Sequence, residues 1–153
     1  MSSNTDRIER RIRLNAARSK VWRALTTPVE FGEWFGVKFN EATFVAGRRI
    51  KGNITYPGYE HVVFDVLIES IEPEQRFSWR WHPYAVERGV DYSQETPTLV
   101  EFELHEVEGG TLLTVVESGF DNVPPARRLE AFRMNSGGWD EQIVNIQKHV
   151  AKK

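Results

Sequence analysis

At 153 residues, and with no linker rich in proline, glycine or serine, the chain has the length of one domain with a sizeable core. Its 20 basic and 22 acidic residues give a net charge of −2, which argues against nucleic acid and anionic membrane as partners. The absence of cysteine excludes disulfides, thiol catalysis and cysteine-held zinc or iron–sulfur centres.

One domain is expected over residues 1–153, with residues 1–6 disordered. This first stretch lacks the apolar segment of a signal peptide, and no later run approaches the roughly 20 apolar residues of a membrane helix. A cytoplasmic location is therefore expected. Ile8, Ile12 and Leu14 fall on one face of an alternating segment. This alternation predicts a first strand, with Arg10 on the same face near an edge.

Two short helices are predicted next. The segment from Ser19 to Leu25 carries apolar residues at helical spacing. A second helix is expected from Thr27 to about Phe35. It opens with a Thr-x-x-Glu capping box, and Pro28 stands at its first helical position.

Beyond the second helix, the apolar period changes from helical to alternating, which predicts six strands. They are Val37 to Val45, Arg48 to Tyr56, His61 to Ile71, Gln75 to Trp81, Thr98 to Val107 and Thr111 to Phe120. Most of the turns between them are short, so neighbouring strands should pair antiparallel as a meander. The exception is Pro83 to Pro97, a length typical of a functional or a disordered loop.

A long amphipathic helix is predicted at the end of the chain. Its apolar residues share one helical stripe: Leu129, Phe132, Trp139, Ile143, Ile146 and Val150. The stripe needs cover, which the sheet can provide. Gly137 and Gly138 each cost roughly 1 kcal/mol in a helix. They indicate either space beside one helix or a break into two.

This order of elements (β-α-α-β6-α) predicts an α+β fold in which a curved, antiparallel, seven-stranded sheet wraps around the terminal helix. The order resembles the helix-grip fold of the START and birch-pollen-allergen (SRPBCC) superfamily. Particular segments resemble its branch related to the activator of the heat-shock-protein-90 ATPase. They are Val21-Trp-Arg-Ala-Leu-Thr-Thr-Pro28 with Trp34, Glu72-Pro73, Gly110-Thr-Leu-Leu113, Glu117-Ser-Gly-Phe120 and Gly138-Trp139.

A sheet curved around one helix leaves room for a cavity, which we expect to bind a small hydrophobic or aromatic molecule. The predicted lining is Trp34, Phe35, Phe64, Trp79, Trp81, Phe102, Glu117, Phe132 and Trp139. The loop from Pro83 to Pro97 would act as its lid. Aromatic residues are routinely buried, so the same cluster is also compatible with a solid core.

Glu117 is the one candidate catalytic group. It alternates with Leu113 and Val115, which places it on the interior face if the strand stays regular. A buried carboxylate needs a partner, such as Arg80, Tyr56 or a ligand. There it would orient the ligand or act as a general base. The alternative is a solvated carboxylate at a strand end.

Other chemistry is poorly supported. The four histidines lack the spacing of a metal triad, so no metal and no cofactor are expected. An enzyme of cyclase, dehydratase or hydrolase type would need Glu117, His82 or Tyr84 together in a cavity. A protein-interaction module with a chaperone partner is the alternative that the resemblance implies. The sequence leaves the ligand's identity and the oligomeric state open.

Overall fold

The computed structural model describes residues 5–152. The prediction of disorder over residues 1–6 therefore falls mainly outside the described residues. Within them, the backbone carbonyl of Asp6 accepts hydrogen bonds from the N–H groups of Gly119 and Phe120, both at 3.1 Å. The start of the described chain is thus attached to the end of the last strand.

The elements follow the predicted order, and the predicted fold class is confirmed. They are β1 (Arg7–Leu14), α1 (Arg18–Thr26), α2 (Pro28–Phe35), β2 (Val37–Phe39), β3 (Arg49–Ile54), β4 (Val63–Glu72), β5 (Arg76–Trp81), β6 (Thr98–Val107), β7 (Gly110–Ser118), the 3₁₀ turn η1 (Phe120–Asn122) and α3 (Pro125–Val150). Alternating burial along β6 and β7 shows that one face of these strands is covered and the other meets solvent.

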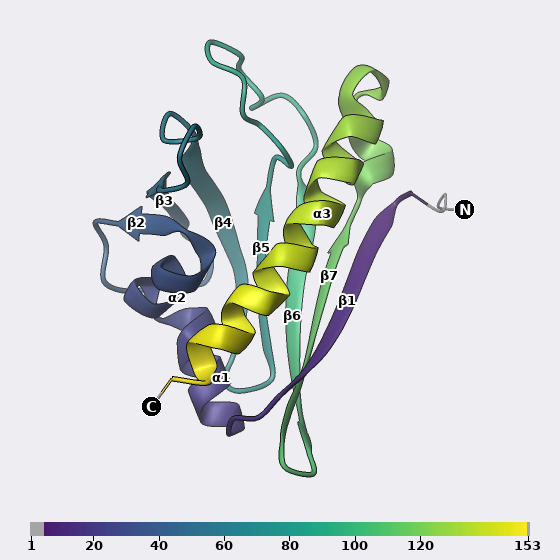
Figure 1. The fold of residues 1–153 in the computed structure, drawn as a ribbon. Coiled ribbons are helices and arrows are strands. Elements are labelled where there is room, and N and C mark those ends of the chain that lie inside the picture. Colours follow the sequence, from purple (N-terminus) through teal and green to yellow (C-terminus); the bar gives the residue numbers. More distant parts are fainter. Residues whose placement is uncertain (1–4, 153) are drawn as a thin grey trace.

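The strands form one antiparallel sheet in the order β1-β7-β6-β5-β4-β3-β2. Strands β2 to β7 therefore form a meander, and β1 pairs with β7 along its full length, from Arg7 opposite Ser118 to Leu14 opposite Thr111. Helix α3 crosses one face of this sheet, while α1 and α2 lie beside its C-terminal end (Figure 1). The long loop between β5 and β6, residues 82–97, lies near the N-terminal end of α3.

Two local predictions were wrong. The strand predicted from Val37 to Val45 ends at Phe39. Phe44 leaves the sheet and is buried, with its ring 5.6 Å from that of Phe77. Burial of this aromatic ring thus takes the place of further strand pairing. The second helix begins at Pro28 as predicted, but the side chain of Thr27 makes no capping hydrogen bond.

Helix α3 is continuous through Gly137 and Gly138, so the alternative of two helices is excluded. Its predicted apolar stripe is buried or half-buried from Phe132 onward, but Leu129 is 58% exposed. Leu129 lies at the margin of the stripe, and the sheet does not cover that side of the first turns. Instead, α3 contacts η1 there, and the rings of Phe120 and Phe132 meet edge to face at 5.3 Å.

The core lies between the sheet, α2 and the C-terminal half of α3. Phe31 is at its centre, with six aromatic rings within 6.1 Å of its own. The indole Nε1–H of Trp34 donates to the carbonyl of Ala24 at 2.8 Å, which ties α2 to α1. Within residues 5–152, no helix has the length and apolar character needed to cross a membrane.

Candidate functional site: a cavity beside the long helix

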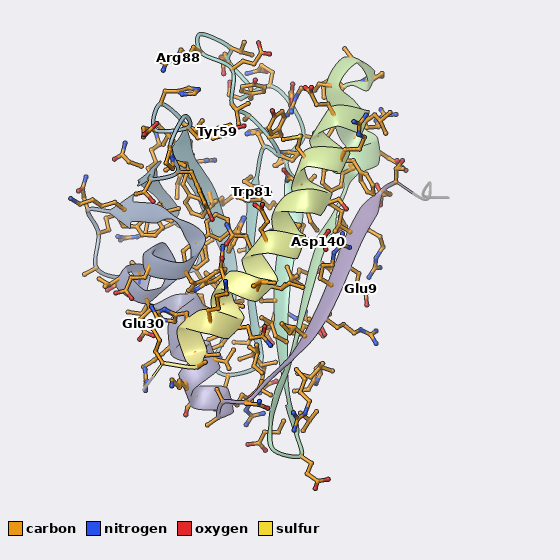
Figure 2. All side chains as sticks on the ribbon, in the orientation of Figure 1. Glu9, Glu30, Tyr59, Trp81, Arg88 and Asp140 are labelled. Atoms are coloured by element: carbon orange, nitrogen blue, oxygen red, sulfur yellow. The ribbon has the colours of Figure 1, made fainter. Side chains whose placement is uncertain are left out.

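A cavity of about 1290 Å³ opens between the sheet and the middle of α3. It is bounded by β3, β4 and the turn that joins them, by residues 81–93, and by residues 133–142 of α3. Trp81 lies between the sheet and α3, while Tyr59 and Arg88 stand farther out on the two loops (Figure 2). The aromatic residues that line the cavity are Phe35, Tyr56, Tyr59, Phe64, Trp81, Tyr84 and Tyr92.

The charges around the cavity balance. Its lining holds four basic side chains and four acidic ones: Arg49, Lys51, Arg88 and Arg133 against Asp65, Glu87, Asp91 and Glu141. Arg49 and Asp65 form an ion pair at 2.8 Å. Hydrogen bonds from Ser93 lower the pKa of Asp91, so its carboxylate stays ionised at neutral pH. The rim therefore carries charges of both signs and no strong net potential.

The loop over the cavity is fastened to α3 by Arg127. The guanidinium donates to both oxygens of Glu95, at 2.9 and 3.1 Å from Nε, and to the carbonyl of Pro83 at 2.7 Å. It also lies over the ring of Tyr92, 4.7 Å from the centroid. Both side chains of the ion pair are largely buried, with 18% and 19% exposed. Arg127 thus holds both ends of the loop against the first turn of α3.

Two histidines and a tyrosine offer proton-transfer groups to the cavity. His82 and His61 each place Nε2 at 2.9 Å from a backbone carbonyl, of Glu95 and Val86 respectively. Because a carbonyl only accepts, each ring donates there through Nε2, and in the neutral ring Nδ1 is then an acceptor. Burial, followed by the nearby Tyr59 and Glu130, raises the pKa of Tyr84, so its phenol stays a donor.

Glu117 lies behind the cavity wall, and its side chain is fully buried. Four side chains donate to its carboxylate. Trp81 Nε1 and Thr98 Oγ1 contact Oε2 at 2.7 and 2.6 Å. Trp139 Nε1 contacts Oε1 at 2.9 Å, and Asn135 Nδ2 contacts both oxygens, at 3.0 and 3.2 Å. This network joins β5, β6 and β7 to α3.

The protonation of Glu117 reflects two opposing effects. Burial raises the pKa of the carboxyl, because the charged form loses its hydration. Hydrogen bonds from Thr98, Trp139, Trp81 and Asn135 lower it, and the net shift is upward. Neither of the partners suggested by the sequence is used: Arg80 pairs with Glu69, and the hydroxyl of Tyr56 accepts a hydrogen bond from Asn145.

Residues 15–151 match the family model described as Activator of Hsp90 ATPase homolog 1-like protein. The chain belongs to this AHSA1-like family. The match spans α1 and α2, the strands from β2 onward and all of α3, so it includes the cavity and the Glu117 network. No curated protein sequence matches the chain.

Solved structures share the fold of this AHSA1-like domain. A protein from Arthrobacter aurescens gives a TM-score of 0.76 at 15% identity, covering 99% of this chain and 91% of the other. One from Nitrosomonas europaea gives 0.74 at 18%, covering 99% and 97%. The structure described as the Aha1 dimer from Colwellia psychrerythraea gives 0.69 at 21%, covering 94% and 95%. At these identities, the likeness concerns the fold alone.

The structure separates the predicted lining residues of this AHSA1-like domain into two groups. Phe35, Phe64 and Trp81 line the cavity. The other predicted residues lie outside its lining: Trp34, Trp79, Phe102, Glu117, Phe132 and Trp139. All of these except Phe132 are buried, and Phe132 packs half-buried against Phe120. His82 and Tyr84 both line the cavity, whereas Glu117 does not.

Sequence reasoning missed several groups at the site. All four tyrosines of the chain line the cavity, although the sequence pointed only to Tyr84 as a functional group and to Tyr56 as a partner of Glu117. A tyrosine combines an apolar ring with a polar tip, and so suits a surface that is neither core nor solvent. Asn135 and Arg127 were missed because their roles depend on partners far away in the sequence. Within residues 5–152, no group of three or more histidine, aspartate or glutamate side chains could hold a metal ion.

Proposed function

We propose that this AHSA1-like domain binds a small, uncharged, hydrophobic or aromatic molecule in the cavity between the sheet and α3. One observation carries the proposal: a cavity of about 1290 Å³ with seven aromatic side chains in its lining. Ligand pockets typically measure about 300–1000 Å³ and are lined by apolar and aromatic groups around a few polar ones. A molecule of two or more fused rings would fit such a space.

The inner wall supports this class of ligand. Phe35, Phe64 and Trp81 form the boundary with the packed core, with ring centroids 5.4 to 6.2 Å apart. A ligand against this wall removes apolar surface from water, which contributes roughly 25 cal/mol per Å². The balance of four basic and four acidic lining residues favours a neutral molecule over a polyanion.

Two glycines provide a direct test, because they lie where α3 passes the cavity. A Cβ atom built at Gly138 would meet no atom within 4 Å, so a larger side chain there enters open space. We expect Gly138→Phe to obstruct the cavity without disturbing the fold. Val144→Phe is the matched control, since it adds the same side chain to an exposed position of α3 outside the cavity.

The experiment is native mass spectrometry after incubation with an extract of the source cells. We expect a discrete, stoichiometric added mass on the wild type and on Val144→Phe, and its loss on Gly138→Phe. A bare protein mass for all three, across several extracts, would contradict the proposal. That result would favour a protein partner, the alternative that the family description suggests.

A second candidate, catalysis on the bound molecule, is favoured by the two acceptor nitrogens and the tyrosine that face the cavity. His82 Nδ1 would take a proton, while the Tyr84 hydroxyl would donate one. The test is to incubate the wild type and His82→Asn with the same extract. We expect a metabolite to be consumed only by the wild type. Identical metabolite profiles would count against this second function.

A further inference from the structure

The amide of Asn135 lies at the boundary between the Glu117 network and the cavity. Its residue lines the cavity, yet its Nδ2 donates to both oxygens of the buried Glu117 carboxylate, at 3.0 and 3.2 Å. Asn135 thus has one side in the core and the other toward the cavity.

The hydrogen bonds around Glu117 determine whether Nδ2 or Oδ1 of Asn135 points toward the carboxylate. The indole of Trp139 can only donate, so Oε1 of Glu117 must accept from it at 2.9 Å. The indole of Trp81 imposes the same on Oε2 at 2.7 Å. Thr98 Oγ1 donates to Oε2 as well, at 2.6 Å. The oxygens of the ionised carboxylate only accept, so Glu117 offers Asn135 an acceptor and the amide turns Nδ2 inward, as its contacts at 3.0 and 3.2 Å show.

The consequence is that Oδ1 of Asn135 is directed away from Glu117. Among the described residues, no hydrogen bond to Oδ1 is formed. Among the described residues, the buried side-chain polar atoms without a hydrogen-bond partner are Arg18 Nε, Trp79 Nε1 and His149 Nδ1. Oδ1 is not one of them, so it is accessible, and Asn135 belongs to the lining of the cavity. Beside it, Trp81 has turned its N–H toward Glu117 and presents an apolar ring.

We propose that Asn135 is the polar anchor of the ligand site, with Oδ1 accepting a hydrogen bond from a hydroxyl or N–H group on an otherwise apolar, aromatic ligand. Glu117 is the positioning residue that holds the amide in this orientation. The inference rests on the proposed function, and it narrows the ligand to aromatic molecules that carry a hydrogen-bond donor. A ligand with acceptors alone would leave this amide oxygen unpaired.

Two probes differ in the hydrogen-bond donor. 2-Naphthol carries a hydroxyl donor, whereas 2-methoxynaphthalene keeps the ring system and the oxygen but has a methyl group in place of the hydroxyl hydrogen. Because one hydrogen bond contributes about 0.5–1.5 kcal/mol net, we expect the wild type to bind 2-naphthol about fivefold more tightly in equilibrium dialysis. Asn135→Ala should reduce this preference to within about twofold. Gln147→Ala, on an exposed face of α3, should leave it unchanged.

Glu117→Gln tests the positioning role. A glutamine can donate as well as accept, so the amide of Asn135 is free to turn over, and the preference for 2-naphthol should fall. If Glu117 had a merely structural role, the variant would lose affinity for both probes by the same factor, and the ratio of the two affinities would stay unchanged. Near-ultraviolet circular dichroism checks that each variant is folded. If Glu117→Gln does not fold, the comparison of wild type with Asn135→Ala decides alone.

The outcomes are separable. Equal affinity of the wild type for the two probes, or an undiminished preference in Asn135→Ala, overturns the role of Asn135 while the proposed function stands. Absence of binding of both probes to the wild type overturns the proposed function and this inference together.

Discussion

The two ends of the space between sheet and long helix are built differently. At the α2 end, Phe31 is surrounded by other rings, and α3 contributes Trp139, Ile146 and Val150 to a closed core. At the other end, α3 contributes Asn135 and two glycines, and an irregular loop takes the place of the two short helices as cover. The space between a curved sheet and one helix is thus filled only where further elements supply side chains. Helices α1 and α2 lie at one end of α3 and the loop at the other (Figure 1).

The largest expected difference between the two ends is in stability. Phe31→Ala removes the ring at the centre of the core and should lower the free energy of unfolding by about 3–5 kcal/mol. Tyr59→Ala removes a ring that is 41% exposed at the cavity. It should change the free energy of unfolding by less than about 0.5 kcal/mol. Urea denaturation measures both. Equal losses would mean that the cavity end is as closely packed as the core.

The next prediction concerns the boundary between the ends, where Glu117 sits. Its pKa is raised from its ordinary value of 4.5, so the folded protein keeps this proton to a higher pH than the unfolded chain does. The contribution of protonated Glu117 to the free energy of unfolding is fully present below about pH 4.5. It is lost as pH rises toward the raised pKa. The stability of the wild type relative to Glu117→Gln should therefore decrease as pH rises through this window. Denaturation curves at several pH values test it, and a constant difference would refute it.

A smaller effect is expected from the loop at the cavity end. Arg127→Lys keeps the charge but loses the planar fork that binds Glu95 and Pro83. We expect a loss of about 1 kcal/mol in stability. Amide exchange should become faster within residues 83–97 but stay unchanged in β6. The exposed pair of Arg7 with Glu9 is the control, because Arg7→Lys should alter neither quantity. Unchanged exchange in the loop of Arg127→Lys would show that other contacts hold it.

The smallest expected effect has the opposite sign. A Cβ atom at Gly137 would meet no atom within 4 Å, so Gly137→Ala adds no clash. Because glycine is a poor helix former, the variant should be about 0.5–1 kcal/mol more stable in urea denaturation. Loss of stability in Gly137→Ala would indicate that the helix needs flexibility at this point.

Much of the fold could be predicted because it depends on local patterns. The alternation from Thr98 to Val107 predicted the whole of β6, and the stripe that ends at Val150 predicted α3. Errors arose where a distant partner competes with the local pattern. Phe44 continued an alternating run but is buried against Phe77, and Leu129 continued the stripe where no strand reaches it.

The candidate site was less predictable for the same reason. Phe35, Phe64, Trp79 and Trp81 are all aromatic residues on the interior side, and nothing local distinguishes those that line the cavity from Trp79, which is buried in the core. The difference depends on whether another element fills the space next to each ring. The partners of Glu117 come from three other elements and from positions up to 36 residues away.

The sequence by itself determined the order of elements and their antiparallel pairing, because hydrophobic period and turn residues act over short distances. Its resemblance to a known superfamily implied the helix-grip class. Only the tertiary structure decided where the space inside the fold stays open. It also decided that four donors converge on one buried carboxylate, and that one of them, Asn135, belongs to a residue that lines the cavity. These features follow from packing and hydrogen-bond satisfaction among residues distant in the chain, which no local pattern encodes.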